Sequence, residues 1–251
     1  MFPSRTRAAA SVLAGEVMLG AERRRAEKPG QMVADDVLVD VRAAPSFVSR
    51  GGVKLANALD GFGLPVAGRR CLDVGASTGG FTDCLLQRGA EAVIALDVAY
   101  GELNWGVRND PRVHVIERCN ARSLEPAALP YVPSLAVIDV SFIAVAKVLG
   151  AVLGCLAPAF DCLAMIKPQF EVGRAAVGKG GVVRDPEARR GALESVAAAA
   201  VQLGASVLGF ASSGLPGPKG NLETFVWLAE TDRPGALDSS GVSAAALQVE
   251  P

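Results

Sequence analysis

The sequence is poor in several residue types, and each shortage excludes a class of protein. Aromatic residues make up only 5% of the 251 residues, so the core must be built from Ala, Val and Leu. His114 is the single histidine and no two cysteines form a C-x-x-C pair, which argues against a zinc site or any other metal centre. No run of eighteen uncharged apolar residues occurs, so no membrane span is predicted. Glu16 interrupts the apolar stretch near the N-terminus, so no signal peptide is predicted either.

The five cysteines and the charge balance narrow the class further. An odd number of cysteines within apolar runs is typical of reduced, buried thiols, and we expect a cytoplasmic protein. The net charge of −1 and the isoelectric point near 5.9 lack the basic excess of many nucleic-acid binders. Half of the residues are apolar, enough for one large α/β domain with a small appendage.

The first 42 residues differ from the rest and predict a small α+β module. A helix-like segment, "RTRAAASVLAGEVML", precedes a Pro-Gly turn and the alternating apolar residues Val37, Val39 and Val41. A basic cluster within this module could bind phosphates, although a solvated basic turn explains it equally well. Residues 43–52 are predicted to be a linker, 53–231 the main domain and 232–251 a disordered tail. The basic cluster consists of Arg23, Arg24, Arg25 and Lys28.

The main domain alternates between short apolar runs and helix-like stretches. The runs are "RRCLDVGA", "AVIALDV", "VHVIE", "SLAVIDV", "CLAMIK", "SVLGFAS" and "LETFVWLAE". Near-continuous apolar strands separated by helices indicate a parallel sheet that is buried on both faces. We therefore predict an α/β fold with about seven strands and helices on both sides.

A glycine-rich turn follows the first of these strands and predicts a ligand site. "CLDVGASTGGF" has the spacing D-x-G-x-x-x-G-G, which fits neither a Walker motif nor G-x-G-x-x-G. Asp97 ends the next strand, roughly 20 residues on, where a carboxylate would accept hydrogen bonds from ribose hydroxyls. Asn120 follows the third strand and is placed to touch an adenine. Together they favour S-adenosylmethionine, while a structural turn and a strand-end cap remain the alternatives. The predicted cofactor contacts are Asp73, Gly75, Ala76, Ser77, Gly79, Gly80, Phe81, Asp97, Val98, Asn120 and Asp139.

Four charged residues bound apolar segments of the main domain. Asp139 and Lys167 each end a strand, Glu223 opens one and Lys54 precedes the first. Carboxyl ends of neighbouring parallel strands converge on one crevice, so Asp139 and Lys167 should meet there. Each residue alone is more simply a solvated strand end, but an acid and a base at equivalent strand ends make a candidate site.

Long sequence blocks resemble one known family. "VSRGGVKL", "LDVGASTGGFTDCLLQRGA", "IDVSFI", "IKPQFEVG" and "GNLETFVWL" are similar to the TlyA family of ribosomal RNA 2′-O-methyltransferases, relatives of the FtsJ methyltransferases, over residues 46–230. The resemblance implies a Rossmann-like S-adenosylmethionine-dependent methyltransferase sheet and a Lys-Asp-Lys-Glu tetrad at Lys54, Asp139, Lys167 and Glu223. It also implies a ribosomal RNA or ribosomal subunit partner, and residues 1–42 are similar to the second half of an S4-type RNA-binding module.

The leading hypothesis is methyl transfer to a ribose 2′-hydroxyl, with Lys167 as general base. Lys54 would stabilise the developing oxyanion, and Asp139 and Glu223 would orient the two lysines. A small-molecule O-methyltransferase of the same fold, a haemolysin or pore-former, and a noncatalytic RNA-binding factor are the alternatives. The predicted RNA contacts are Arg23, Arg24, Arg25, Lys28, Arg50 and Lys179, and the oligomeric state stays open.

Overall fold

The computed structural model describes residues 4–41, 46–173 and 176–250. The chain divides into two compact units, Met1–Ser46 and Phe47–Pro251, which are described separately. Within the described part of the chain, every helix is too short or too polar to cross a membrane.

The N-terminal unit is a helix with a small antiparallel sheet, as the sequence predicts. Helix α1 (Arg5–Ala14) leads into β1 (Val17–Leu19), β2 (Arg24–Arg25) and β3 (Val39–Val41). The strand order is β2-β1-β3, with Met18 opposite both Arg25 and Asp40. Few side chains are buried, mainly Val17, Met18 and Ala26, so this unit has only a minor core.

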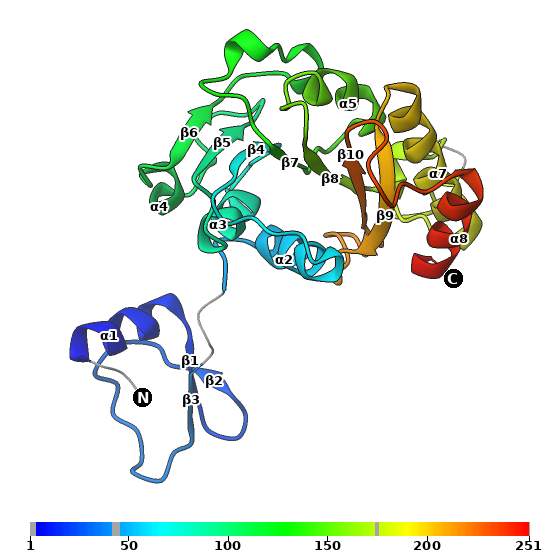
Figure 1. The fold of residues 1–251 in the computed structure, drawn as a ribbon. Helices are drawn as coiled ribbons and strands as arrows, with labels where there is room; N and C mark the ends of the chain where they lie inside the picture. Colours follow the sequence, from blue (N-terminus) through cyan, green and yellow to red (C-terminus); the bar gives the residue numbers. More distant parts are fainter. Residues whose placement is uncertain (1–3, 42–45, 174–175, 251) are drawn as a thin grey trace. The chain divides into compact units, whose positions relative to one another are not determined.

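The second unit is built on a seven-stranded sheet in the order β6-β5-β4-β7-β8-β10-β9 (Figure 1). The strands are β4 (Arg70–Val74), β5 (Ala92–Leu96), β6 (Val113–Ile116), β7 (Leu135–Ile138), β8 (Asp161–Ile166), β9 (Ser206–Ser212) and β10 (Thr224–Ala229). The predicted number of strands is confirmed. The predicted parallel pairing holds from β6 to β8 along the sheet but is wrong for β10, which runs antiparallel to both β8 and β9. Only residues 213–223 connect β9 to β10, too few for the helical crossover that parallel neighbours require.

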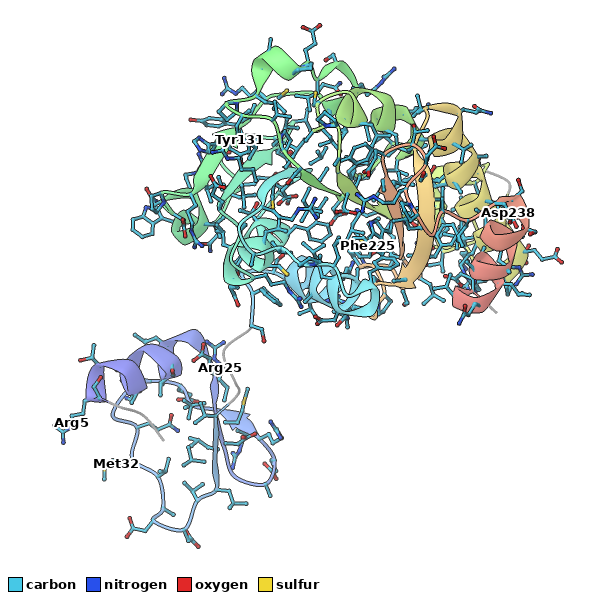
Figure 2. All side chains as sticks on the ribbon, viewed as in Figure 1. Arg5, Arg25, Met32, Tyr131, Phe225 and Asp238 are labelled. Carbon is cyan, nitrogen blue, oxygen red and sulfur yellow. The ribbon has the colours of Figure 1, made fainter. Side chains whose placement is uncertain are left out.

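Helices cover both faces of this sheet and enclose two apolar layers. One layer packs under α2 (Arg50–Phe62), α3 (Gly80–Gln87) and α4 (Trp105–Arg108). The other packs under α5 (Ala146–Leu153), α7 (Pro186–Gln202) and α8 (Ser239–Val249). Phe225, labelled in Figure 2, is a fully buried side chain of the first layer. The short elements η1 (Ala121–Ser123), η2 (Pro126–Ala128) and α6 (Pro168–Glu171) lie in the connections.

Two helices lie where the sequence predicted irregular structure. Helix α2 begins at Arg50, inside the predicted linker 43–52, of which residues 43–45 lie outside the described residues. Ser49 caps α2 by accepting a hydrogen bond from the Gly51 N–H. Helix α8 occupies the predicted disordered tail, so that prediction is wrong. Asp238, labelled in Figure 2, caps α8, and Ala246 is fully buried against the second apolar layer. Small residues on α8 allow this close packing, and they made the segment look unpatterned.

Candidate active site

The site lies where the order of the strands reverses. Strands β4 and β7 are neighbours in the sheet, and the chain leaves them toward opposite edges, so their carboxyl ends open a crevice. A cleft of about 490 Å³ occupies this position. Its lining includes Gly75, Ser77, Asp97, Val98, Glu102, Asn120, Asp139, Phe142 and Ile143.

The glycine turn after β4 brings the backbone against β7. Gly75 has a φ of 86°, and a Cβ at this position would lie 2.5 Å from the Asp139 carbonyl oxygen. No larger residue fits without moving the backbone, so glycine is required here. Ser77 adopts a φ of 47° in the same turn, an uncommon conformation for a residue with a side chain.

Asp97 is held in one orientation by the backbone of this turn. Its Oδ2 accepts a hydrogen bond from the Ser77 N–H at 2.7 Å, and its Oδ1 accepts one from the Ala99 N–H at 2.7 Å. Each carboxylate oxygen can accept a further hydrogen bond, so the group remains able to bind hydroxyls in the cleft. Asn120 also lines the cleft, and its Oδ1 caps η1 by accepting from the Arg122 N–H.

Two predicted cofactor contacts, Asp73 and Gly79, line neither this cleft nor the neighbouring pocket described below. Asp73 is fully buried, and its Oδ2 accepts a 2.6 Å hydrogen bond from the Thr82 hydroxyl, which ties β4 to α3. The pKa of Asp73 is raised to about 7. Burial is the largest cause, the nearby charge of Asp139 adds to the rise, and the Thr82 hydrogen bond opposes it. Gly79 packs against Leu103 and Val107 on α4.

A second pocket of about 370 Å³ shares Gly75, Ser77 and Asp139 with the cleft. The predicted residues Ala76, Gly80 and Phe81 line this pocket rather than the cleft. The rest of its wall consists of Ser49, Arg50, Gly51, Lys54, Thr78 and Pro218. The two pockets therefore meet at Gly75, Ser77 and Asp139, with Lys54 of α2 in one pocket and Asp97, which follows β5, in the other.

The four charged residues form two ion pairs. The Lys167 Nζ lies 2.5 Å from Asp139 Oδ1 and donates a 2.8 Å hydrogen bond to the Ser141 hydroxyl, so the predicted meeting of Asp139 and Lys167 is confirmed. Lys54 donates a short hydrogen bond to Glu223, although 169 residues separate them in the sequence. Both members of this second pair are buried, and a buried ion pair persists only when its partners satisfy each other.

The reversed direction of β10 places Glu223 in this group. Thr224 pairs with Ile166, so Glu223, which precedes β10, lies beside the end of β8 and Lys167. If β10 were parallel to β8, the residue before it would lie at the amino end of the strands, on the opposite side of the sheet from Lys167.

The predicted RNA contacts are exposed, but several have partners. Arg23 pairs with Asp40 at 2.5 Å, Arg24 with Glu22 at 3.4 Å, and Arg25 donates to the Leu13 carbonyl. Lys28 and Lys179 are exposed. Arg50 donates a 2.8 Å hydrogen bond to the Pro216 carbonyl and lines the second pocket.

Sequence reasoning missed three residues at the site. Ser141 holds Lys167, Glu102 accepts a hydrogen bond from the Ser77 hydroxyl, and Phe142 is 91% exposed with a φ of 66°. Ser141 and Phe142 belong to the block "IDVSFI", so a polar and an aromatic residue within four positions of the end of an apolar run were the available signal. Among the residues whose positions are described, no group of three His, Cys, Asp or Glu side chains could hold a metal ion.

The chain is similar to proteins of known family over most of its length. The model of the FtsJ-like methyltransferase family matches residues 47–230. The 16S/23S rRNA (cytidine-2′-O)-methyltransferase TlyA of Mycobacterium tuberculosis is 49% identical over 242 residues, covering 95% of this chain and 89% of the relative.

Solved structures agree with this similarity. A Streptococcus thermophilus protein named as a hemolysin has a TM-score of 0.78 and 39% identity, covering 99% of this chain and 90% of its own. An S-adenosylmethionine-dependent methyltransferase from Mesorhizobium loti shares the fold alone, with a TM-score of 0.53 and 16% identity over 72% of this chain and all of its own. The glycine turn, the crevice at the strand reversal and the matched residues lead to one assignment: the chain belongs to the FtsJ-like methyltransferase family.

Proposed function

We propose that this protein transfers a methyl group from S-adenosylmethionine to a ribose 2′-hydroxyl of ribosomal RNA. The observation that carries the proposal is the pair of lysine–carboxylate contacts, Lys54–Glu223 and Lys167–Asp139, beside a cleft that contains a backbone-held acid. The similarity to an enzyme whose name states this reaction supports the substrate class.

The residues of the cleft fit S-adenosylmethionine. Its volume of about 490 Å³ lies within the range of ligand pockets. Asp97 would accept hydrogen bonds from the ribose hydroxyls, Val98 and Ile143 offer apolar contacts to an adenine, and the Gly75 turn leaves room for the methionine portion. When bound, the cofactor supplies a methyl group already activated by its sulfonium.

The chain's own residues would then position the hydroxyl and remove its proton. We assign Lys167 Nζ, in its neutral amine form, as the acceptor of this proton, and Asp139 and Ser141 hold that nitrogen in place. Lys54 supplies positive charge for the oxygen as it loses the proton, and Glu223 orients Lys54. All four side chains are fixed before the substrate arrives, which lowers the entropic cost of alignment.

RNA would be held by basic residues outside the tetrad. Arg23, Arg24, Arg25 and Lys28 present an exposed basic turn in the predicted S4-type module. Arg50, which lines the second pocket, and Lys179 of the second unit would contact further phosphates. A ribosomal substrate would place the protein in the cytoplasm, which agrees with five free cysteines.

A small-molecule acceptor is the second candidate, because the net charge of −1 is unusual for an RNA-binding enzyme. One experiment separates the two. Labelled S-adenosylmethionine is incubated with the protein and small or large ribosomal subunits, and in parallel with a low-molecular-weight extract. RNA is then digested to nucleosides and separated by chromatography.

We expect label in a 2′-O-methylnucleoside from ribosomal RNA. Lys167→Met should remove this label, whereas Lys147→Met, which changes an exposed lysine of α5, should retain it. Label found only in small molecules would overturn the proposal. Lysis of lipid vesicles by the purified protein, without label in RNA, would favour the haemolysin reading instead.

A further inference from the structure

A second buried ion pair lies outside the tetrad. Arg189 on α7 and Glu250, which follows α8, pair at 2.7 Å, and their side chains are only 11% and 5% exposed. Burying two charges is costly unless both make additional hydrogen bonds. Both partners make such hydrogen bonds here. Those of Glu250 reach the start of β10, and those of Arg189 reach a loop that is also bonded to the segment before β10.

Glu250 contacts the strand that carries Glu223. Its Oε1 accepts a 3.3 Å hydrogen bond from the Thr224 hydroxyl. Thr224 is the first residue of β10, follows Glu223 directly and pairs with Ile166, next to Lys167. The carboxylate of Glu250 therefore contacts the start of β10, directly after Glu223 and beside the end of β8 that precedes Lys167.

Arg189 contacts the end of a glycine-rich loop, residues 178–184, which we call the glycine loop. Its Nη1 donates hydrogen bonds to the carbonyl oxygens of Arg184 at 2.8 Å and of Val183 at 3.4 Å. Its Nε donates to Glu250 Oε2. One guanidinium thus joins the loop to the carboxylate that holds β10.

Asn221 holds the glycine loop from the other side. This buried residue accepts a 2.9 Å hydrogen bond from the Val183 N–H and donates one of 2.8 Å to the Gly181 carbonyl. Asn221 lies two residues before Glu223 in the chain. The glycine loop, which carries Lys179, and the start of β10 are therefore tied together by Asn221 and by the Arg189–Glu250 pair.

We propose that Arg189 and Glu250 are positioning residues for the acceptor side of the methyltransferase: they hold the glycine loop and the start of β10 so that Glu223 stays on Lys54. This inference rests on the proposed function. The cofactor cleft is lined by residues at the ends of β4, β5 and β7 and by η1 and α5, none of which carries Arg189 or Glu250, so loss of the pair should affect use of the RNA and leave cofactor binding intact.

The test compares Glu250→Ala, Glu250→Gln and a matched control, Asp161→Asn. Asp161 is also a buried carboxylate paired with an arginine, Arg69. It is the first residue of β8, whereas Lys167 follows the last, so the two lie at opposite ends of this strand. Measurements are the Kd for S-adenosylmethionine by calorimetry, kcat and KM with ribosomal subunits, and hydrogen exchange of peptides covering 178–184.

We expect Glu250→Ala to lower kcat/KM for the subunits about tenfold to 100-fold, because small displacements of catalytic groups have effects of this size. Cofactor Kd should stay within about twofold of wild type, and exchange in the glycine loop should rise. Glu250→Gln keeps one oxygen that can accept from Arg189, while its amide NH2 can donate to the Thr224 hydroxyl, so it should recover most of the activity. Asp161→Asn should lower thermal stability without changing kcat/KM or loop exchange.

Wild-type turnover in Glu250→Ala would overturn the inference, as would equal losses of cofactor affinity and turnover. If Glu250→Ala does not fold, Glu250→Gln decides, since it should show a few-fold loss in kcat/KM with unchanged cofactor Kd. Absence of RNA labelling by the wild-type protein would instead count against the proposed function, and loop exchange would still test the positioning role.

Discussion

The two halves of the active-site edge are held together in different ways. In the half formed by β4 and β5, the acid that faces the cleft is held by backbone groups: Asp97 accepts from the Ser77 and Ala99 N–H groups. In the half formed by β7, β8, β10 and α2, the charged side chains bind one another, in the Lys167–Asp139 and Lys54–Glu223 pairs. The first half is therefore set by local chain geometry and the second by tertiary packing.

This difference suggests a division of labour between binding and chemistry. A carboxylate fixed by the main chain keeps free acceptor capacity and suits the recognition of hydroxyls. Paired charges in a buried setting can redistribute when a proton moves, which suits acid–base chemistry. Substitutions in each half should thus have separable effects on cofactor affinity and on turnover.

The largest effect is expected for Lys167→Met. Loss of the proton acceptor should lower kcat by about 10³-fold or more, because general base catalysis contributes on the order of 10²–10⁴-fold. Cofactor Kd, measured by calorimetry, should change little, since Asp97 and the glycine turn remain. Retained turnover would remove Lys167 from the mechanism, and a large loss of cofactor affinity would contradict the separation of the two halves.

Asp97→Ala should have the opposite signature. Removing this carboxylate frees two backbone N–H groups and the predicted ribose contact, each worth about 1–3 kcal/mol. We expect the Kd for S-adenosylmethionine to rise about 100-fold, with kcat nearly unchanged at saturating cofactor. Equal cofactor affinity in wild type and variant would show that the cleft binds its ligand without Asp97.

Gly217→Ala should disturb the second half without removing a charged group. An added Cβ would collide with Glu223 Oε1, which must then move away from Lys54. We expect kcat to fall about tenfold with unchanged cofactor Kd. Gly191→Ala is the control, because nothing lies within 4 Å of its added Cβ and alanine favours the helix. If both variants behave alike, the orientation of Glu223 does not limit the reaction.

Asp73→Asn should have the smallest effect on turnover and a clear effect on stability. The folded-state pKa of Asp73 is about 7, above its ordinary value of 3.8. Between these two pH values the folded protein keeps a proton on Asp73 that the unfolded protein has lost. Wild-type stability is therefore greatest below about pH 4 and falls as the pH rises toward 7, relative to Asp73→Asn. The full difference in that pKa corresponds to on the order of 4 kcal/mol.

Denaturant unfolding at several pH values between 4 and 8 measures this difference. Asp232→Asn, which changes an exposed carboxylate, serves as the control and should follow wild type. Parallel pH profiles for wild type and Asp73→Asn would show that Asp73 stays ionised in the folded protein.

Much of the second unit could be predicted from local patterns. All seven apolar runs form strands, and the ends of β7 and β8 bring Asp139 to Lys167 as adjacent parallel strands require. Helices α2 and α8 were missed because their flanks are rich in small and polar residues, which resemble a linker and a tail. Their helical character depends on burial against the sheet, through Leu55 in α2 and Ala246 in α8.

By itself, the sequence determined the strands, the glycine turn and the acid that closes the second strand, because these depend on contacts between residues near each other in the chain. Only the tertiary structure decided that β10 is antiparallel to β8. Glu223, which precedes β10, therefore lies at the same end of the sheet as Lys167, which follows β8. The tertiary structure also decided that Lys54 pairs with Glu223 and that Arg189 pairs with Glu250. The partners in each pair are far apart in the sequence, so only folding places them in contact. A buried charge is stable only with such a partner.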